Sequence, residues 1–222
     1  FVHYQGLQKA RCTRFDNFRN IVSILWPKIE WNMWLEKQIQ SLCDNQFVSW
    51  TGCAASGKTF AGALYSTVWW ICQPDVSAAV LTSTTKGMLR KRMWSEVQKL
   101  YASMEWNPPG NMVDSKTVWQ AVKGDEKNAV FGLAVKDGNT AAAVGHIQGI
   151  HTSRVLIVID EATDTPQAIF DATANLYAGC EQFQMLVIGN PNSHFDPHGK
   201  FSEPKDGWNS VNVETEDWET KI

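Results

Sequence analysis

Residues 52–59 read Gly52-Cys53-Ala54-Ala55-Ser56-Gly57-Lys58-Thr59, which is a complete G-x-x-x-x-G-K-T pattern. The apolar run Phe47–Trp50 precedes it and the helical pattern of residues 60–72 follows it, so a strand, a loop and a helix are expected in that order. Glycines let such a loop curl until its N–H groups point at phosphate oxygens, and the helix adds its positive N-terminus. The pattern predicts a nucleotide site, with Lys58 at the β- and γ-phosphates and Thr59 at Mg²⁺.

A second motif delivers two carboxylates to the edge of the expected sheet. Residues 155–159 are all apolar, which is typical of a central parallel strand, and they end in Asp160 and Glu161. Because neighbouring strand residues project to opposite sides, we expect Asp160 at the Mg²⁺ shell and Glu161 at an attacking water. The alternative is helix capping, since Asp and Glu both favour a helix start. The upstream phosphate loop favours the catalytic interpretation.

Composition limits the classes of protein. The chain has 222 residues, 44% of them hydrophobic, enough for one large α/β domain. A net charge of −3 argues against a uniformly basic nucleic-acid-coating protein, so any DNA contact must be local. Five cysteines without C-x-x-C spacing indicate reduced thiols rather than disulfides or zinc. No apolar run approaches membrane-spanning length and no secretory signal is evident, so we expect no membrane partner.

The remaining patterns predict an alternation of strands and helices. We expect helices over residues 31–42, 86–101 and 166–178, strands over 78–82 and 184–188, a β-hairpin from 117–122 and 129–135, and a mobile loop or short helix over 137–149.

Together these features resemble the ATPase domain of the large terminase subunit, the DNA-packaging motor of tailed bacteriophages and related viruses. The resemblance runs from about residue 35 to residue 201. It rests on the phosphate loop, residues 155–162 (Val-Leu-Ile-Val-Ile-Asp-Glu-Ala), Gln148-Gly149-Ile150-His151, Gly189-Asn190-Pro191 and Gly199-Lys200-Phe201. It implies an α/β P-loop NTPase of the additional-strand, catalytic-glutamate type, with a mainly parallel central sheet and helices on both faces.

The resemblance also implies roles for further residues. Asn190 would sense the γ-phosphate and link hydrolysis to DNA movement, although Gly-Asn-Pro by itself is an ordinary turn signal. Gln38 would contact adenine, with Gln40 as the second choice; the alternative for either is an exposed polar helix position. Many terminases carry an arginine within the phosphate loop, whereas residues 53–55 contain none.

Another cation is therefore expected to neutralise the transition state, since such an arginine is worth several kcal/mol of barrier. The candidates are Arg154, Lys136, Arg90 and Arg92. Arg154 precedes the apolar strand and is alternatively a solvated charge. Because the terminases that this chain resembles assemble as rings, the adjacent subunit is another source of the cation.

Lys86, Arg90, Lys91 and Arg92 form the best local footprint for a DNA backbone, with a solvated helix face as the alternative. The resemblance implies Mg²⁺-dependent ATP hydrolysis that translocates double-stranded DNA into a procapsid. The implied partners are duplex DNA, a homo-oligomeric ring, a portal protein and a small terminase subunit, in the cytoplasm of an infected host cell.

We expect a helical lead over residues 1–34, the ATPase domain over 35–205, and a closing strand or linker to a nuclease domain over 206–222. No cleavage activity is expected from this chain. The nearest alternative function is a helicase or other nucleic-acid remodelling ATPase, which usually carries a second motor domain. A small-molecule phosphotransferase, which would not need Glu161, and a non-catalytic nucleotide-binding adaptor are the remaining alternatives.

Overall fold

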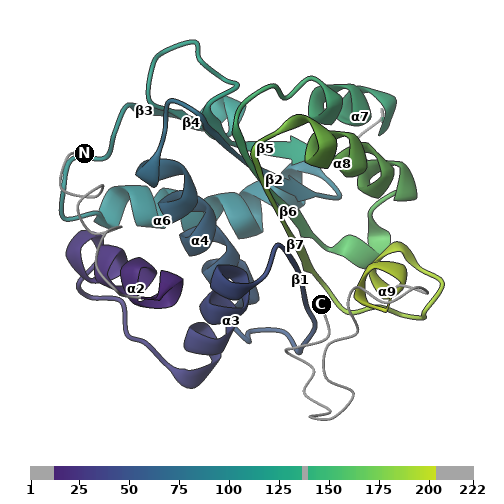
Figure 1. Ribbon diagram of the computed structural model, residues 1–222, viewed down its shortest axis with the longest axis horizontal. Helices are drawn as coiled ribbons and strands as arrows, with labels where there is room; N and C mark the ends of the chain where they lie inside the picture. The colour runs from purple at the N-terminus through teal and green to yellow at the C-terminus, as the bar shows by residue number, and fades with distance from the viewer. Residues whose placement is uncertain (1–12, 137–139, 204–222) are drawn as a thin grey trace.

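The computed structural model describes residues 13–136 and 140–203. They form a seven-stranded sheet in the order β1-β7-β6-β2-β5-β4-β3 (Figure 1). The strands are β1 (Phe47–Trp50), β2 (Ser77–Ser83), β3 (Asn111–Val113), β4 (Val118–Gln120), β5 (Ala129–Ala134), β6 (Arg154–Asp160) and β7 (Gln182–Ile188). The first five strands of that order run parallel, and β4 and β3 add an antiparallel edge.

The position of β7 defines the class of this sheet. β7 pairs with β1 on one side and with β6 on the other, so one strand separates the phosphate-loop strand from the strand that carries the carboxylates. Ile188 of β7 lies in register with both Trp50 and Asp160, so these three strands end together at the carboxyl edge. The predicted additional-strand P-loop fold is therefore confirmed.

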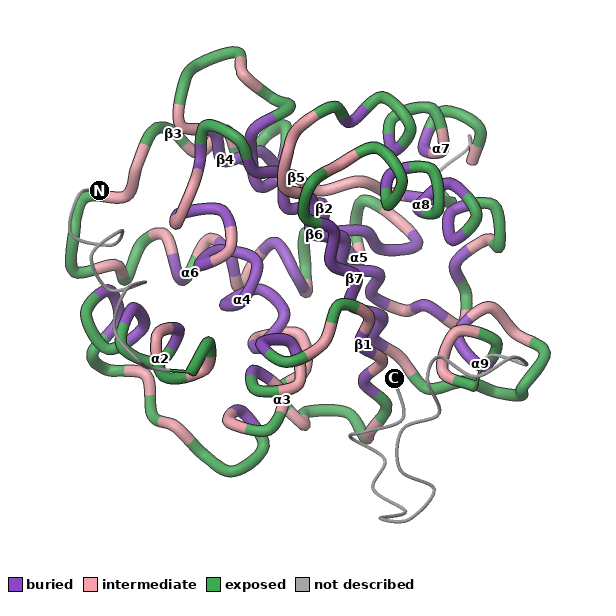
Figure 2. Tube along the Cα trace, viewed as in Figure 1, coloured by how far each residue is buried: buried purple, intermediate pink, exposed green. Residues whose placement is uncertain are grey.

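Helices cover both faces of the sheet (Figure 1). One face carries α2 (Arg14–Leu25), α3 (Met33–Asp44), α4 (Lys58–Cys72) and α6 (Ser95–Ser103), and the other carries α7 (Thr140–Gln148) and α8 (Gln167–Gly179). The short helices α5 (Lys86–Leu89), η1 (Arg90–Trp94), η2 (Asp114–Lys116), η3 (Ala162–Asp164) and α9 (Pro197–Ser202) complete the described chain. The central strands are buried along most of their length (Figure 2).

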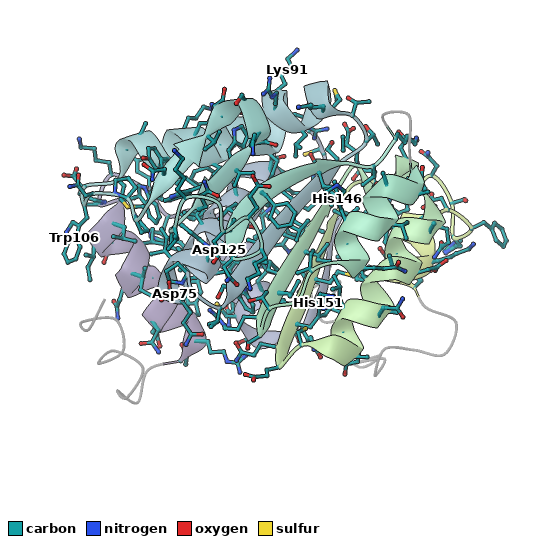
Figure 3. All side chains as sticks on the ribbon, turned by 90° about the horizontal axis from the view of Figure 1, so that it is seen from above. Asp75, Lys91, Trp106, Asp125, His146 and His151 are labelled. Carbon is teal, nitrogen blue, oxygen red and sulfur yellow. The ribbon has the colours of Figure 1, made fainter. Side chains whose placement is uncertain are left out.

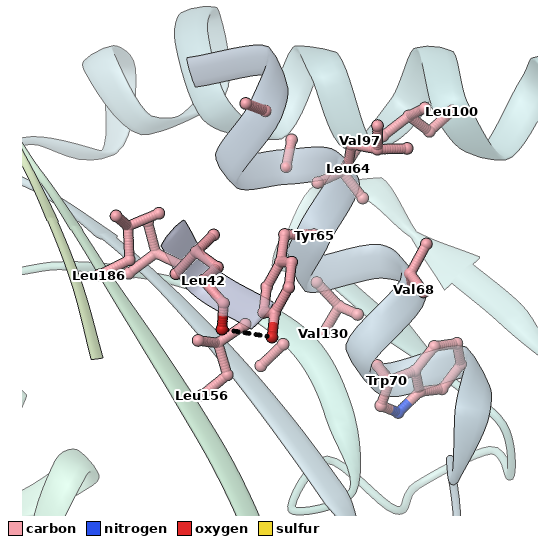
Figure 4. Close-up of a cluster of buried hydrophobic side chains, with 14 of the residues drawn as sticks. Leu42, Leu64, Tyr65, Val68, Trp70, Val97, Leu100, Val130, Leu156 and Leu186 are labelled. Atoms are coloured by element: carbon pink, nitrogen blue, oxygen red, sulfur yellow. Dashed lines mark hydrogen bonds between the residues drawn. The ribbon is translucent and has the colours of Figure 1, made fainter. Parts of the chain in front are cut away.

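The larger core lies around α4, which is apolar nearly all round and is buried along most of its length. Figure 4 shows Tyr65 of α4 among leucine and valine side chains from the sheet and the neighbouring helices. Its hydroxyl has two acceptors for its one proton, Gln184 Oε1 at 2.8 Å and the Leu42 carbonyl at 3.2 Å. These bonds satisfy the polar end of a buried ring. These contacts hold α4, whose first turn carries Lys58 and Thr59, against the sheet.

Two local features differ from the sequence-based expectation, and a third agrees with it. Strand β3 extends the predicted hairpin. Residues 140–148 form helix α7, which is one of the two structures predicted for that segment. The expected single helix over residues 86–101 instead contains the π-helical segment η1 between α5 and α6. Residues 1–12 of the predicted helical lead, residues 137–139 and the predicted closing strand or linker over 206–222 lie outside the described residues. In the described ranges, every helix is too short or too polar to cross a membrane.

Candidate nucleotide-binding and hydrolysis site

The predicted phosphate loop connects β1 to α4 at the carboxyl edge of the sheet. Gly57 adopts a left-handed conformation (φ 81°) directly before the first residue of α4, and Gly52 has φ 153°. Both conformations favour glycine, which explains two of the fixed positions of the pattern. Ala55 is also left-handed, at φ 61°, a strained conformation for a residue with a Cβ. The loop therefore has the curled backbone that a phosphate cradle needs.

Lys58 lies inside this loop. Its ammonium donates to the Gly52 carbonyl (2.6 Å), the Cys53 carbonyl (2.9 Å) and Ser56 Oγ (2.9 Å). Partial burial lowers the pKa of Lys58, and Asp160 is among the groups that oppose this shift. Thr59 follows in the first turn of α4, as the motif requires. A nucleotide phosphate would compete with the loop carbonyls for the ammonium.

Asp160 is the last residue of β6 and is only 1% exposed. Neither of its carboxylate oxygens meets the geometry of a hydrogen bond with a described residue. Arg92 Nε lies 3.7 Å from Oδ2, and the backbone N–H of Glu161 and the Lys58 ammonium also favour the charged form. Burial raises the pKa of Asp160 to about 6, and the Arg92 guanidinium offsets this only in part. A buried carboxylate without donors is costly, and a divalent cation is a group that would stabilise it.

Mg²⁺ fits these residues. The described ranges hold no cluster of three or more His, Cys, Asp or Glu side chains. Mg²⁺ in phosphoryl-transfer sites uses only one or two protein ligands, together with waters and substrate phosphates. Asp160 and the Thr59 hydroxyl are of the chemical type that this arrangement uses, and they lie at the same edge of the sheet.

Glu161 follows Asp160 but leaves the strand. Its backbone is left-handed (φ 57°), so a turn, rather than strand alternation, separates the directions of the two carboxylates. Glu161 occupies the N-cap position of η3, yet its side chain makes no capping hydrogen bond. Its Oε1 instead forms an ion pair with Arg92 Nη1, and its Oε2 accepts from Thr84 Oγ1 at 3.1 Å. The capping alternative therefore does not describe this side chain.

Asn190 connects the phosphate loop to the turn after β6. Its Oδ1 accepts from the backbone N–H of Gly52 at 2.9 Å, and its carbonyl accepts from Thr163 Oγ1 at 2.6 Å. Thr163 belongs to η3, immediately after Glu161 and Ala162. The structure thus brings the predicted γ-phosphate sensor into contact with both halves of the site.

Gln38 of α3 lies against the loop, where its Nε2 donates to the Ser56 carbonyl at 3.3 Å. Its Oε1 is buried without a hydrogen-bond partner in the described chain. Gln40 is exposed, so of the two glutamines Gln38 is the one at the loop.

Arg154 lies away from the site, contrary to its selection as a catalytic candidate within this chain. It is the first residue of β6, six residues before Asp160, which corresponds to about 20 Å along a strand. Its guanidinium donates to Ser77 Oγ (2.8 Å), Gln182 Oε1 (2.7 Å) and the Trp69 carbonyl (3.3 Å), and it stacks on the Trp69 ring. These contacts hold it at the amino edge of the sheet.

The expected DNA footprint divides into separate environments. Arg90 donates to the carbonyls of Asp114 (3.0 Å) and Ser115 (2.9 Å). Lys91 is exposed and points away from the molecule (Figure 3), whereas Arg92 turns toward the carboxylates. Arg92 is therefore part of the candidate site rather than of an outward basic face.

Two residues of the site were not selected from the sequence. Thr84 follows β2, and its contact with Glu161 depends on β2 lying next to β6, a pairing that the order of strands along the chain does not reveal. Thr163 had no distinguishing pattern. A further cavity of about 830 Å³ lies at the amino edge, lined by Tyr65, Trp69 and Arg154 among others, and the residues of the phosphate loop and Asp160 are not among those that line it.

Comparison with known proteins supports the fold. No protein-family model and no curated protein matches the sequence. Among solved structures, the chain is similar to the large terminase of bacteriophage HK97, with TM-score 0.67 and 12% identity over 86% of this chain and 41% of that one. It is also similar to the large terminase of a thermophilic bacteriophage, with TM-score 0.52 and 17% identity over 73% of this chain and 40% of that one.

A third similar structure is a mutant of the large terminase ATPase domain of Thermus phage P74-26, with TM-score 0.51 and 14% identity over 78% of this chain and 70% of that one. The chain spans about two-fifths of the length of the first two terminases. At these identities the comparisons establish a shared fold, and the chain has the fold of large-terminase ATPase domains.

Proposed function

We propose that this chain is the ATPase motor domain of a viral large terminase, which hydrolyses ATP with Mg²⁺ and couples hydrolysis to the translocation of double-stranded DNA into a procapsid. The observation that carries the proposal is Asp160, a buried carboxylate without a hydrogen-bond donor, at the strand ends where the loop lysine and Glu161 also lie. A fold similar to that of large terminases supports the choice of motor.

Nucleotide binding follows from the loop geometry. Lys58 would neutralise charge on the β- and γ-phosphates, and the N–H groups of the curled loop would bind phosphate oxygens. Gln38 would offer its unpartnered Oε1 to the adenine amino group. One of the solved structures with this fold, a large terminase from a thermophilic bacteriophage, was determined in complex with ADP, with TM-score 0.51 and 17% identity over 70% of this chain and 38% of that one.

In the proposed reaction, the oxygen of a water attacks the γ-phosphorus, the bond to the β–γ bridging oxygen breaks, and Glu161 accepts the proton of the water. Mg²⁺, when bound through Thr59 and Asp160, would neutralise charge on the phosphate oxygens. Asn190 would report the state of the γ-phosphate, because it contacts the loop through Gly52 and the Glu161 turn through Thr163.

The proposed partners follow from the terminase assignment. They are duplex DNA, further copies of the chain in a ring, a portal protein and a small terminase subunit, in the host cytoplasm. The exposed Lys91 is the residue of the basic cluster best placed to meet DNA (Figure 3). A nucleic-acid remodelling ATPase of another kind remains the second candidate, because it would share the loop and the Asp-Glu pair.

Glu161→Gln tests the hydrolytic part of the proposal. The variant keeps the shape of the side chain and leaves Asp160 in place, so ATP should still bind. Single-turnover hydrolysis should fall by about two to four orders of magnitude, the usual effect of losing a positioned general base. Glu126→Gln, which alters an exposed glutamate paired with Lys116 on the distant hairpin, is the matched control. Wild-type hydrolysis by Glu161→Gln would refute the catalytic-glutamate assignment.

Duplex DNA tests the motor part. The proposal predicts that DNA stimulates ATP hydrolysis and that added salt reduces this effect, because Lys and Arg contacts to phosphates release counterions. A helicase-like enzyme would instead unwind a duplex with a single-stranded tail, so an unwinding assay separates the two candidates.

A further inference from the structure

Arg92 brings a guanidinium to both carboxylates of the site. Its Nη1 forms the ion pair with Glu161 Oε1, and its Nε lies 3.7 Å from Asp160 Oδ2. Its side chain is 39% exposed, so it lies at the mouth of the site rather than in the core. The structure thus supplies, from within the same chain, a cation that residues 53–55 of the phosphate loop lack.

The π-helical segment η1 explains how Arg92 reaches this position. π-Helical turns are rare, and they occur most often at functional sites. Within η1, Met93 and Trp94 are fully buried, and Trp94 Nε1 donates to Asp114 Oδ1 at 2.9 Å. These contacts fix the C-terminal half of η1 against the fold. Arg92, immediately before them, is thereby directed toward the carboxyl edge of the sheet, while Lys91 points outward (Figure 3).

The ion pair competes with the catalytic task of Glu161. One of its carboxylate oxygens accepts from Arg92 and the other from Thr84. A carboxylate offers about four lone-pair sites, so these two donors leave about half of them for a water, and departure of Arg92 frees a further site and the space beside it. A second argument concerns Asp160. A divalent cation bound at this carboxylate would repel the Arg92 guanidinium, whose Nε lies 3.7 Å from Asp160 Oδ2.

We propose that Arg92 is an arginine that each chain supplies to its own active site. It holds Glu161 while the γ-phosphate is absent, and it transfers to the γ-phosphate when ATP and Mg²⁺ bind. The triphosphate offers more negative charge than one carboxylate and suits the planar guanidinium, which binds phosphate in a bidentate manner. Transfer releases Glu161 to orient water and places a cation where charge develops. This inference rests on the proposed ATPase function.

The experiment compares nucleotide binding with catalysis in Arg92→Ala and Arg92→Lys. Affinities for ADP and for a non-hydrolysable ATP analogue are measured with Mg²⁺, together with single-turnover ATP hydrolysis. In Arg92→Ala the preference for the triphosphate over ADP should fall about tenfold, because only the triphosphate contacts Arg92, while ADP affinity stays within about twofold. Hydrolysis should fall by about two to three orders of magnitude. Arg92→Lys should recover part of the preference for the triphosphate and part of the rate of hydrolysis.

The matched control is Arg19→Ala, which removes the arginine of an Arg–Glu ion pair (2.9 Å to Glu36) between α2 and α3, away from the site. It should leave both measurements unchanged. Glu161→Gln supplies an independent signature, because Arg92 is then held less strongly. Its preference for the ATP analogue over ADP should rise above that of the wild type, although it hydrolyses ATP slowly.

Three results would overturn the inference. If Arg92→Ala keeps the wild-type preference for the triphosphate, Arg92 only positions Glu161. Faster hydrolysis by Arg92→Ala would show that the ion pair only inhibits Glu161 and that Arg92 does not assist the reaction. If Arg92→Ala does not fold, the inference is also rejected when Arg92→Lys and Glu161→Gln both keep the wild-type preference for the ATP analogue over ADP. A wild-type chain that binds no nucleotide at all contradicts the proposed function instead.

Discussion

The charged residues at the two edges of the parallel sheet differ in how many hydrogen bonds the fold provides for them. At the amino edge, the partly buried guanidinium of Arg154 donates to three acceptors and stacks on Trp69. At the carboxyl edge, Asp160 is more deeply buried and has no hydrogen-bond donor among the described residues, and Ala55 and Glu161 hold left-handed backbone conformations. Both edges belong to the same strands, so the difference does not come from the sheet itself.

This difference distinguishes charged residues that stabilise the fold from charged residues that are available to a ligand. A charged group whose hydrogen bonds and stacking are supplied by the fold, as for Arg154, is stabilised by the fold. A deeply buried carboxylate that accepts no hydrogen bond and has only a partly exposed guanidinium 3.7 Å away costs stability, and a fold retains such a cost where a ligand compensates for it. By this criterion the carboxyl edge is the site and Arg154 is part of the scaffold.

Lys58→Ala should produce the largest effect at the carboxyl edge. ATP turnover should fall by about three orders of magnitude, because the ammonium that neutralises the β- and γ-phosphates is lost. The free energy of unfolding should change by less than about 0.5 kcal/mol, since the bonds that Lys58 makes are to its own loop. Steady-state hydrolysis and urea denaturation measure the two effects. Lys99→Ala, which alters an exposed lysine paired with Glu96, is the control. Near-normal ATP turnover by a folded Lys58→Ala variant would refute the assignment of residues 52–59 as the phosphate-binding loop.

Much of this contrast was accessible from the sequence. The phosphate loop and the apolar run ending in Asp160 are local patterns, because each depends on a strand and the residues that follow it. The additional-strand fold was also predicted, since the resemblance to terminases implied this fold type, which periodicity alone could not. Local patterns also gave most helices and strands to within a few residues.

The remaining features depend on contacts between distant segments. That Arg92 pairs with Glu161 follows from a π-helical turn and from β2 lying beside β6, neither of which leaves a local pattern. Arg154 was chosen because it precedes the apolar strand that ends in Asp160, yet a strand of seven residues places its two ends at opposite edges of the sheet. Along an extended strand, residues that are close in sequence can therefore lie far apart in space, as Arg154 and Asp160 do.

Asp160→Asn should separate stability from function at the same edge. Because burial raises the pKa of Asp160 from 3.8 to about 6, the folded state binds the proton more tightly than the unfolded state does. The resulting cost is absent below about pH 4, grows as the pH rises toward 6, and is complete above it. At about pH 7.5 and without nucleotide, the variant should be more stable by about 1–3 kcal/mol.

That gain should disappear as the pH falls from about 6 to about 4, because the wild-type carboxyl becomes neutral. Denaturation at several pH values measures it, and Asp164→Asn, an exposed carboxylate in the next turn, is the control. Mg²⁺-dependent ATP binding should weaken about tenfold or more, since an amide cannot replace the charge of a carboxylate at a divalent cation. A destabilised Asp160→Asn would mean that the carboxylate is held by the fold and would erase the contrast between the edges.

Arg154→Met should produce the smallest effect, and at the opposite edge. Methionine keeps the length and apolar stem of the side chain but removes the donors to Ser77, Gln182 and the Trp69 carbonyl. Losing these bonds and the stacking on Trp69 should lower the free energy of unfolding by about 1–2 kcal/mol. Nucleotide affinity and single-turnover hydrolysis should stay within about twofold of wild type, because residue 154 is about 20 Å from Asp160 along the backbone of β6.

Either result for Arg154→Met is informative, because in a ring Arg154 of one subunit could lie beside the active site of its neighbour. If Arg154→Met lowers hydrolysis about a hundredfold only at protein concentrations where the chains associate, Arg154 acts on the adjacent subunit and its satisfied contacts are a resting position. If hydrolysis is unchanged at every concentration, the amino edge is scaffold. In that case Arg92, which contacts Glu161 at the carboxyl edge, is a stronger candidate than Arg154 for the arginine of the proposed reaction.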